Sequence, residues 1–249
     1  MEKMEEKAKN EYSFSFLKPI LLLAGLFLFL FLLKINDTFS LFSDQVKIEG
    51  ITFSAADNFF PVGAVAINEV MWMGSAEDPK DEWIELKNNT DEEVDLSGWN
   101  IQSGGKGKKG HIEIPHGYSI KADGYFLLLR KKWDESSINL EDKPDKDDGL
   151  VHISGMDLDD DGEQLILTNK NKNGLVIDIA GKEDEKWLAG EDGEGSGMSM
   201  QRKDAEEDGT KEDNWQTCRE EECAGDEYWK ITEDEAGLNL GTPGGENVF

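Results

Sequence analysis

Short segments in which apolar residues recur at alternate positions follow one another through most of the chain. Residues 65–72 are rich in β-branched side chains, and residues 82–87 alternate apolar with polar positions. The same kind of segment recurs at 94–101, 111–114, 118–120, 125–130, 150–153, 164–168 and 175–179. Turn-forming pairs such as Asp-Gly and Asn-Gly separate them, and no amphipathic stretch of helical length intervenes. The pattern predicts an all-β sandwich or barrel.

One apolar run does not fit this pattern. Residues 20–33 carry no charge, and Lys18 and Lys34 bracket them. A membrane-spanning helix needs about 20 apolar residues, and a lysine at its end can extend its ammonium group to the lipid headgroups. Lysines also precede the run, which favours an amino terminus on the cytoplasmic side. We therefore predict a signal-anchor helix at 19–34, preceded by a cytoplasmic segment at 1–18.

An anchor of this kind places the rest of the chain outside the cytoplasm. Residues 35–62 are then an extracytoplasmic linker, and 63–247 form the folded domain. The alternative is a secreted protein cleaved near Ser40, because Thr38 and Ser40 are small enough for a cleavage site.

Export also bears on the two cysteines, Cys218 and Cys223. An oxidising compartment favours a disulfide between them. The alternative is half of a zinc site, but the sequence has no second cysteine pair, and its three histidines lie far away. We predict the disulfide.

Several segments resemble the lamin-tail domain family. Those similar to its strands and hairpins are 65–70, 82–90, 94–99, 114–124, 161–167 and 173–178. Those similar to its carboxyl-terminal features are Ser199-Met-Gln-Arg202, Asn214-Trp215 and Thr242-Pro-Gly-Gly-Glu-Asn247. The resemblance spans roughly 64–247 and implies an immunoglobulin-like β-sandwich of the lamin-tail type. Similar domains are regarded as tethering or adhesion units, and bacterial copies often accompany secreted or membrane-bound hydrolases.

Charge narrows the set of partners. The chain has 26 Lys and Arg against 54 Asp and Glu, a formal net charge of -28. Such a field repels phosphate backbones, so we predict no binding to nucleic acid. The acids concentrate at 134–149 and 183–235, which are expected to be acidic loop insertions. A glycine-rich stretch holds Lys106, Lys108 and Lys109, where a hairpin tip is favoured over an anion site.

Asp157, Asp159 and Asp161 alternate before Gly162. Carboxylates at this spacing can converge on one calcium ion. An EF-hand would need a closing glutamate at the position of Thr168, so an EF-hand is excluded. An acidic hairpin tip and a looser calcium site remain, and calcium is the one cofactor that the sequence suggests.

Glu69 and Glu85 fall in neighbouring predicted strands and could form a carboxylate pair of the kind glycosidases use. We favour a structural role at strand edges and turns, because no nucleophile–base motif accompanies them. The prediction is a protein that is not an enzyme and has no catalytic residues.

Four tryptophans, Trp133, Trp187, Trp215 and Trp229, fall in or beside predicted loops. They could stack against a sugar or a peptide, or anchor the loops on the sandwich, which we favour. The function expected is a non-catalytic extracytoplasmic binding, adhesion or tethering module that contacts protein or glycan and is held at the membrane by 19–34. The alternative is a calcium-dependent hydrolase, or an accessory domain of a secreted hydrolase.

Overall fold

The structure is a computed structural model, and it describes residues 61–103, 110–139, 149–169, 174–193, 196–219, 223, 228–230 and 238–248. These residues belong to one compact unit, Phe60–Phe249. The predicted anchor helix at 19–34 and the segment 1–18 lie outside the described residues, as do Lys106, Lys108 and Lys109.

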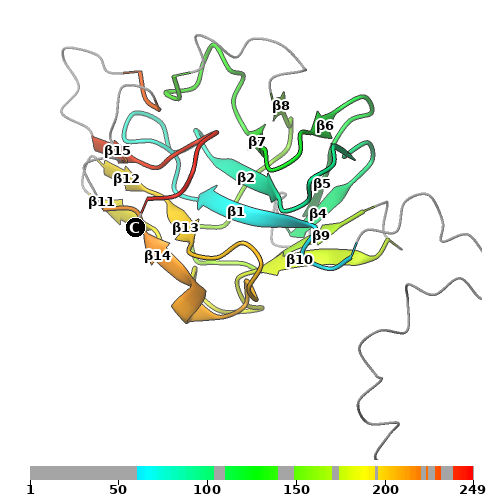
Figure 1. The fold of residues 1–249 in the computed structure, drawn as a ribbon. Coiled ribbons are helices and arrows are strands. Elements are labelled where there is room, and N and C mark those ends of the chain that lie inside the picture. The colour runs from blue at the N-terminus through cyan, green and yellow to red at the C-terminus, as the bar shows by residue number, and fades with distance from the viewer. Residues whose placement is uncertain are drawn as a thin grey trace, which may run out of the picture. The chain divides into compact units, whose positions relative to one another are not determined.

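The larger sheet has six strands in the order β14-β13-β1-β2-β7-β8. Its strands are β1 (Val65–Met71), β2 (Trp83–Asn88), β7 (Tyr125–Leu129), β8 (Leu150–His152), β13 (Met200–Arg202) and β14 (Trp215–Thr217). Neighbouring strands run antiparallel, except that β8 is parallel to β7. The sheet therefore combines strands from both halves of the folded domain (Figure 1).

A second sheet has four strands in the order β10-β9-β4-β5. Its strands are β4 (Asn100–Ser103), β5 (Gly110–Glu113), β9 (Leu165–Thr168) and β10 (Val176–Ala180). Side chains from both sheets share the main core, among them Val70, Ile84, Leu86, Phe126, Leu128, Ile101, Ile112, Leu165, Leu167 and Ile177. The prediction of an all-β protein is confirmed, and the two packed sheets are consistent with an immunoglobulin-like sandwich.

Two small sheets complete the described part. One pairs β3 (Val94–Asp95) with β6 (Ser119–Ile120). The other joins β11 (Glu191–Gly193), β12 (Ser196–Met198) and β15 (Leu238–Leu240), with β15 parallel to β12. These last three strands lie together at the left of Figure 1, away from β9 and β10.

The six-stranded sheet is covered on both faces. Because side chains alternate along a strand, Met71 and Trp83 point away from the core that contains Val70 and Ile84. They pack in a second cluster whose other buried members are Met73, Leu127, Leu129, Ile138, Leu150 and Trp229. Antiparallel sheets commonly leave one face to solvent. Here β1 is buried along its whole length.

The region 183–235 differs from the expected acidic loop. Its described part contains β11, β12, β13 and β14, together with the 3-10 helix η2 (Glu212–Asn214). Buried side chains such as Met200 and Trp215 alternate among the acids, and β13 pairs directly with β1. The acids in the described part of this region lie largely in turns, where their charge stays in water, so the acidic composition concealed the strands.

Candidate functional site

The two candidate catalytic carboxylates, Glu69 and Glu85, do come together. They are opposite each other on β1 and β2, next to a β-bulge at Asn68. Both are fully buried. Asn68 Nδ2 donates to Glu85 Oε1 at 2.8 Å, and the Gly244 amide donates to Glu85 Oε2 at 2.6 Å. Glu85 is thus bound to the neighbouring strand β1 and to the carboxyl-terminal segment.

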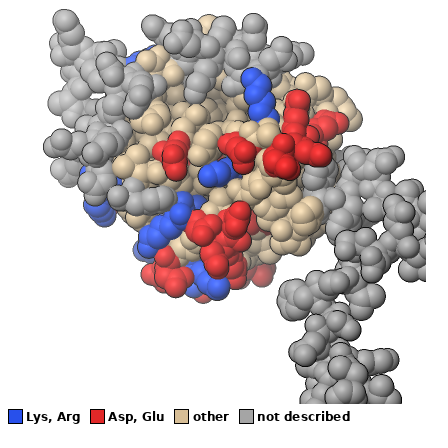
Figure 2. Space-filling view, in the orientation of Figure 1, with Lys and Arg blue, Asp and Glu red and all other residues tan. Residues whose placement is uncertain are grey.

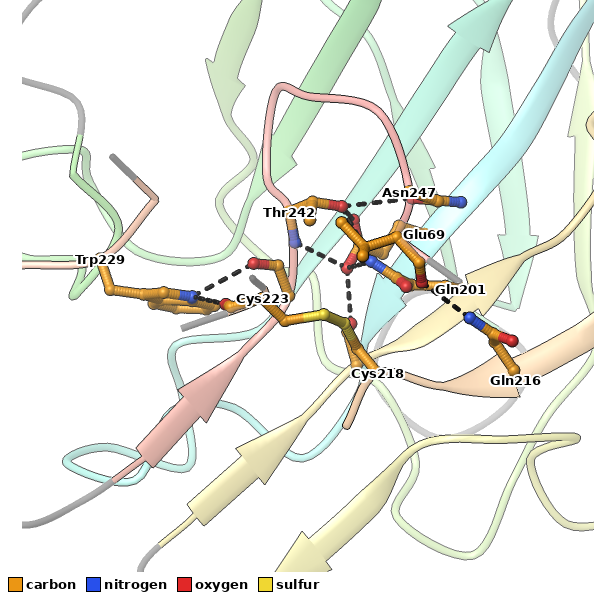
Figure 3. Close-up of a disulfide and its surroundings, with 11 residues drawn as sticks. Glu69, Gln201, Gln216, Cys218, Cys223, Trp229, Thr242 and Asn247 are labelled. Carbon is orange, nitrogen blue, oxygen red and sulfur yellow. Dashed lines mark hydrogen bonds between the residues drawn. A yellow bond between two sulfur atoms is a disulfide. The ribbon is translucent and has the colours of Figure 1, made fainter. Parts of the chain in front are cut away.

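Glu69 accepts still more hydrogen bonds (Figure 3). The Thr242 amide donates at 3.0 Å and its hydroxyl at 2.9 Å, Gln201 Nε2 donates at 3.1 Å, and the Ser199 hydroxyl also donates. Burial raises the pKa of Glu69, and the hydrogen bonds from Ser199, Thr242 and Gln201 oppose that rise. The carboxylate is therefore enclosed by donors of the protein itself, which is the structural role favoured from the sequence.

The carboxyl-terminal segment covers this acid pair. Asn247 Nδ2 donates to the carbonyls of Asn68 at 3.2 Å and Arg202 at 2.8 Å. A Cβ at Gly241 would lie 3.0 Å from a Glu69 oxygen and 3.1 Å from the Ser199 hydroxyl, so the chain passes close to the acid here. The Thr-Pro-Gly ending of the domain acts as a lid over Glu69 and Glu85.

Cys218 and Cys223 form a disulfide beside this lid (Figure 3). Both are fully buried and pack with Leu240 of β15. The carbonyl of Cys223 accepts hydrogen bonds from Trp229 Nε1 at 2.9 Å and from the Gly241 amide at 3.1 Å. The disulfide therefore fixes the chain that leads into the lid.

A buried ion pair joins the two large sheets. Arg202 on β13 donates two hydrogen bonds to Asp178 on β10, at 2.6 and 3.1 Å. The same guanidinium donates to the Ile67 carbonyl, and the Ile67 amide donates to Asp178. Burial raises the pKa of Asp178, and the Arg202 hydrogen bond and charge oppose it. Arg202 also lies over the Trp215 ring, with 5.6 Å to its centroid.

Two of the three aspartates of the calcium hypothesis, Asp157 and Asp159, use a carboxylate oxygen in other interactions. Asp157 Oδ1 lies 2.6 Å from the guanidinium of Arg130, and Asp159 Oδ1 accepts the Asp161 amide at 2.9 Å. Within the ranges that the structure describes, no group of three or more His, Cys, Asp or Glu side chains is placed to hold a metal ion. Calcium binding at Asp157, Asp159 and Asp161 stays a prediction.

Arg130 also contacts the buried Glu82. The Leu158 amide donates to the other oxygen of Glu82 at 2.9 Å. Burial nevertheless raises the pKa of Glu82 to about 7, against the lowering effects of the Leu158 amide and Arg130. Sequence reasoning missed this acid, because nothing in the alternation of residues 82–87 distinguishes it.

The loop tryptophans mostly anchor their loops, as favoured from the sequence. Trp187 stacks on Trp72 with centroids 6.2 Å apart and donates to the Asp159 carbonyl at 2.8 Å. Trp215 and Trp229 are buried in different clusters. Trp133 is 44% exposed. The four rings do not make one common platform.

A hollow of about 370 Å³ lies between β10 and the loop after β13, and we call it the β10 groove. Val62 and Val176 provide apolar lining, and Arg202 lines its floor. Glu206, Glu207 and Asp208 are exposed along its edge. In Figure 2, acidic side chains gather with a few basic ones on the lower part of the face, over the region where Figure 1 shows β14 and β10.

Comparison with known families agrees with this fold. Residues 60–184, just over half of the chain, match the family model described as Lamin Tail Domain. The chain belongs to the lamin tail domain family. A search of curated proteins found no match. The lamin-tail match ends before β11, so the acid pair lies within the matched part while the lid and the disulfide lie beyond it.

No helix in the described part of this lamin-tail protein is long and apolar enough to cross a membrane. The predicted anchor at 19–34 is outside that part, so its role is still a prediction.

Proposed function

We propose that this protein is a non-catalytic binding module, held at the outer face of a membrane by residues 19–34, which contacts protein or glycan through the loops of its lamin-tail domain. Lamin-tail domains are immunoglobulin-like and often serve in interactions. The membrane location and the partner are the proposed parts.

The observation that carries the proposal is that Glu69 and Glu85 are buried and hydrogen-bonded within the protein. Catalytic carboxylates must reach the substrate, and one of them must exchange protons with it. Glu69 and Glu85 are instead fully buried, and groups of the carboxyl-terminal segment occupy their oxygens. The strongest candidate for catalysis in the sequence therefore serves to hold the fold together, which supports a role in binding.

Protease accessibility in intact bacterial cells tests the location. We would express the full chain with a carboxyl-terminal epitope tag and add protease outside the cells. The expected result is membrane-bound protein whose tag is lost without lysis. A variant with Leu26→Lys and Leu28→Lys should leave the membrane fraction, because lysine near the middle of a bilayer is costly. Full-length protein that survives protease until lysis would contradict the proposal.

Binding and turnover are tested separately, binding in cells and turnover with the purified full chain. A membrane-impermeant amine crosslinker applied to the same cells should join the protein to an outer-face partner. Turnover of peptide, ester or glycoside substrates should be absent with and without calcium. Calcium-dependent hydrolysis that is abolished by Asp159→Ala and Asp161→Ala would favour the hydrolase alternative.

A further inference from the structure

We infer that the β10 groove binds a segment of a partner protein that carries lysine or arginine next to apolar side chains. The inference rests on the proposed binding function and deepens it by naming the surface and the chemistry of the partner. Two features of the groove support it: an apolar wall and an acidic edge with a fixed shape.

The apolar wall consists of Val62 and Val176, and both side chains are exposed to solvent. Val62 is 81% and Val176 is 42% exposed, and Leu175, next to Val176 in the chain, is exposed as well. Among the described residues the other large apolar side chain in this state is Trp133. Apolar side chains gathered in one place on a surface mark binding sites, because covering them removes apolar area from water.

The floor of the groove is the buried guanidinium of Arg202. Arg202 is 2% exposed, and four hydrogen bonds engage its two terminal nitrogens. Its Nε has no hydrogen-bond partner among the described residues. That nitrogen has almost no accessible surface, so a bound segment cannot reach it, and Arg202 serves instead to fix the shape of the floor.

The acidic edge is held in place before any partner arrives. Asn214 binds the loop twice, as its side chain accepts from the Asp204 amide and donates to the Asp204 carbonyl, each at 3.0 Å. Trp215 Nε1 donates to the Gly209 carbonyl at 2.8 Å. A Cβ at Gly209 would lie 2.3 Å from the Ile179 carbonyl, so the loop lies directly against β10. A fixed loop loses little conformational entropy on binding.

The charge of the edge selects the partner. Glu206, Glu207 and Asp208 are exposed, and the nearest ion pair, Lys211 with Glu207 at 3.8 Å, is exposed on both sides. Such surface pairs are weak, so a cation of the partner can compete for these carboxylates. The net charge of -28 also steers cationic partners toward the chain. A peptide is favoured over a glycan because the described residues that line the groove include no aromatic ring on which a sugar could stack.

Defined probes test the assignment with the full chain in non-ionic detergent. The principal probe is the fluorescein-labelled peptide Lys-Val-Lys-Ser-Lys-Val, and binding is followed by fluorescence anisotropy. Lys-Ser-Lys-Ser-Lys-Ser lacks the apolar side chains, and Glu-Val-Glu-Ser-Glu-Val lacks the cations. We expect the first peptide to bind at least about fivefold more tightly than either of the others. Its affinity should fall as salt rises from about 50 to about 300 mM.

Matched variants locate the site. Glu206→Gln with Glu207→Gln should weaken binding of the principal probe about tenfold, and Val176→Ser about fivefold. The control is Asp134→Asn with Glu135→Gln, which removes the same charge from exposed positions after β7, away from β10 in the strand order. The control should change the affinity less than about twofold.

Each contrary result has a separate meaning. If the serine probe binds as tightly as the principal one, or if the control pair weakens binding as much as Glu206→Gln with Glu207→Gln, the attraction is general and the groove assignment is wrong. A labelled neutral hexasaccharide that binds and is lost with Val176→Ser would also overturn it. Mass spectrometry of the recovered peptide tests the underlying function, since cleaved probe would defeat the non-catalytic proposal whatever the groove variants do.

Discussion

The two faces of the six-stranded sheet are both buried, but by different means. The inner face meets the four-stranded sheet through a continuous apolar cluster. The outer face meets the carboxyl-terminal segment through a smaller apolar cluster and the two buried acids, Glu69 and Glu85. Apolar contacts are non-directional, whereas hydrogen bonds to a buried carboxylate require particular donors at particular places. The inner face therefore gives the domain its core, and the outer face selects which segment covers it.

Burying an acid is costly unless donors surround it. Glu69 has donors from β13 and from Thr242, and Glu85 has the Gly244 amide. Misplacement of the carboxyl-terminal segment by one residue would remove the donors that Thr242 supplies to Glu69 and Gly244 supplies to Glu85. Buried polar groups of this kind are known to fix register in other folds, and here they fix the lid.

Arg202 joins the six-stranded sheet to the four-stranded sheet through Asp178, and its loss should have the largest effect on stability. Arg202→Ala leaves Asp178 buried without its cation and removes the donor to Ile67. Breaking a buried ion pair from one side costs about 3–5 kcal/mol. We expect urea denaturation to show a loss of free energy of unfolding in this range.

The double variant Arg202→Met with Asp178→Leu separates charge from packing. Because no lone charge remains, it should be less destabilised than Arg202→Ala. The exposed neighbour Lys203, replaced by alanine, is the control and should change little. A loss below about 1 kcal/mol for Arg202→Ala would mean that the pair does not hold the sheets together.

Glu69→Gln should have the next largest effect. Glutamine keeps one acceptor oxygen and replaces the other by an amide nitrogen, which cannot accept. In one orientation it loses the bond from the Thr242 hydroxyl at Oε2, and in the other it loses the three bonds at Oε1 from Ser199, Gln201 and the Thr242 amide. We expect a loss of about 2–3 kcal/mol, the upper range for buried groups left unsatisfied. Glu113→Gln, on the exposed side of β5, is the matched control. Equal stability of the two variants would show that the lid does not depend on Glu69.

The sequence predicted the structure of the inner face more completely than that of the outer face. The alternation in 82–87 and the apolar run in 125–130 predicted strands, and the structure has β2 and β7 there. Periodicity reports which face is buried, but it does not report partners. The contact of Arg202 with Asp178 spans the two sheets and leaves no periodic signal. The best available signal was the resemblance of 242–247 to the family ending, whose contacts with Glu69 and Glu85 the sequence did not reveal.

Removal of the disulfide should destabilise the outer face and leave the inner face unchanged. A short ring such as the one between Cys218 and Cys223 stabilises by about 2 kcal/mol in the loop-entropy model. We expect Cys218→Ser with Cys223→Ser to lose about this amount. Hydrogen exchange should rise at β15, while β4 and β9 of the inner layer keep their protection.

Reduction of the disulfide in the unaltered chain is the control for the double serine variant. Dithiothreitol should lower the stability of the unaltered chain to that of the double serine variant and leave the variant unchanged. Uniform loss of protection, β9 included, would show that the two faces unfold as one unit and would remove the distinction between them.

Glu82 lies inside the family-matched part, and its effect appears as a change of stability with pH. Its pKa rises from 4.5 in the ordinary state to about 7 in the folded protein, because burial outweighs Arg130 and the Leu158 amide. Between these values the folded chain keeps a proton that the unfolded chain has released. Stability therefore falls as pH rises from about 4.5 to about 7, by at most about 1.4 kcal/mol per pH unit for one proton, and levels off above. Glu82→Gln carries no titrating group, so the difference between the two unfolding curves isolates this contribution from the other buried acids. A difference that does not change with pH would mean that Glu82 stays ionised beside Arg130, and that the inner region, unlike the outer one, buries its acid as a charged partner.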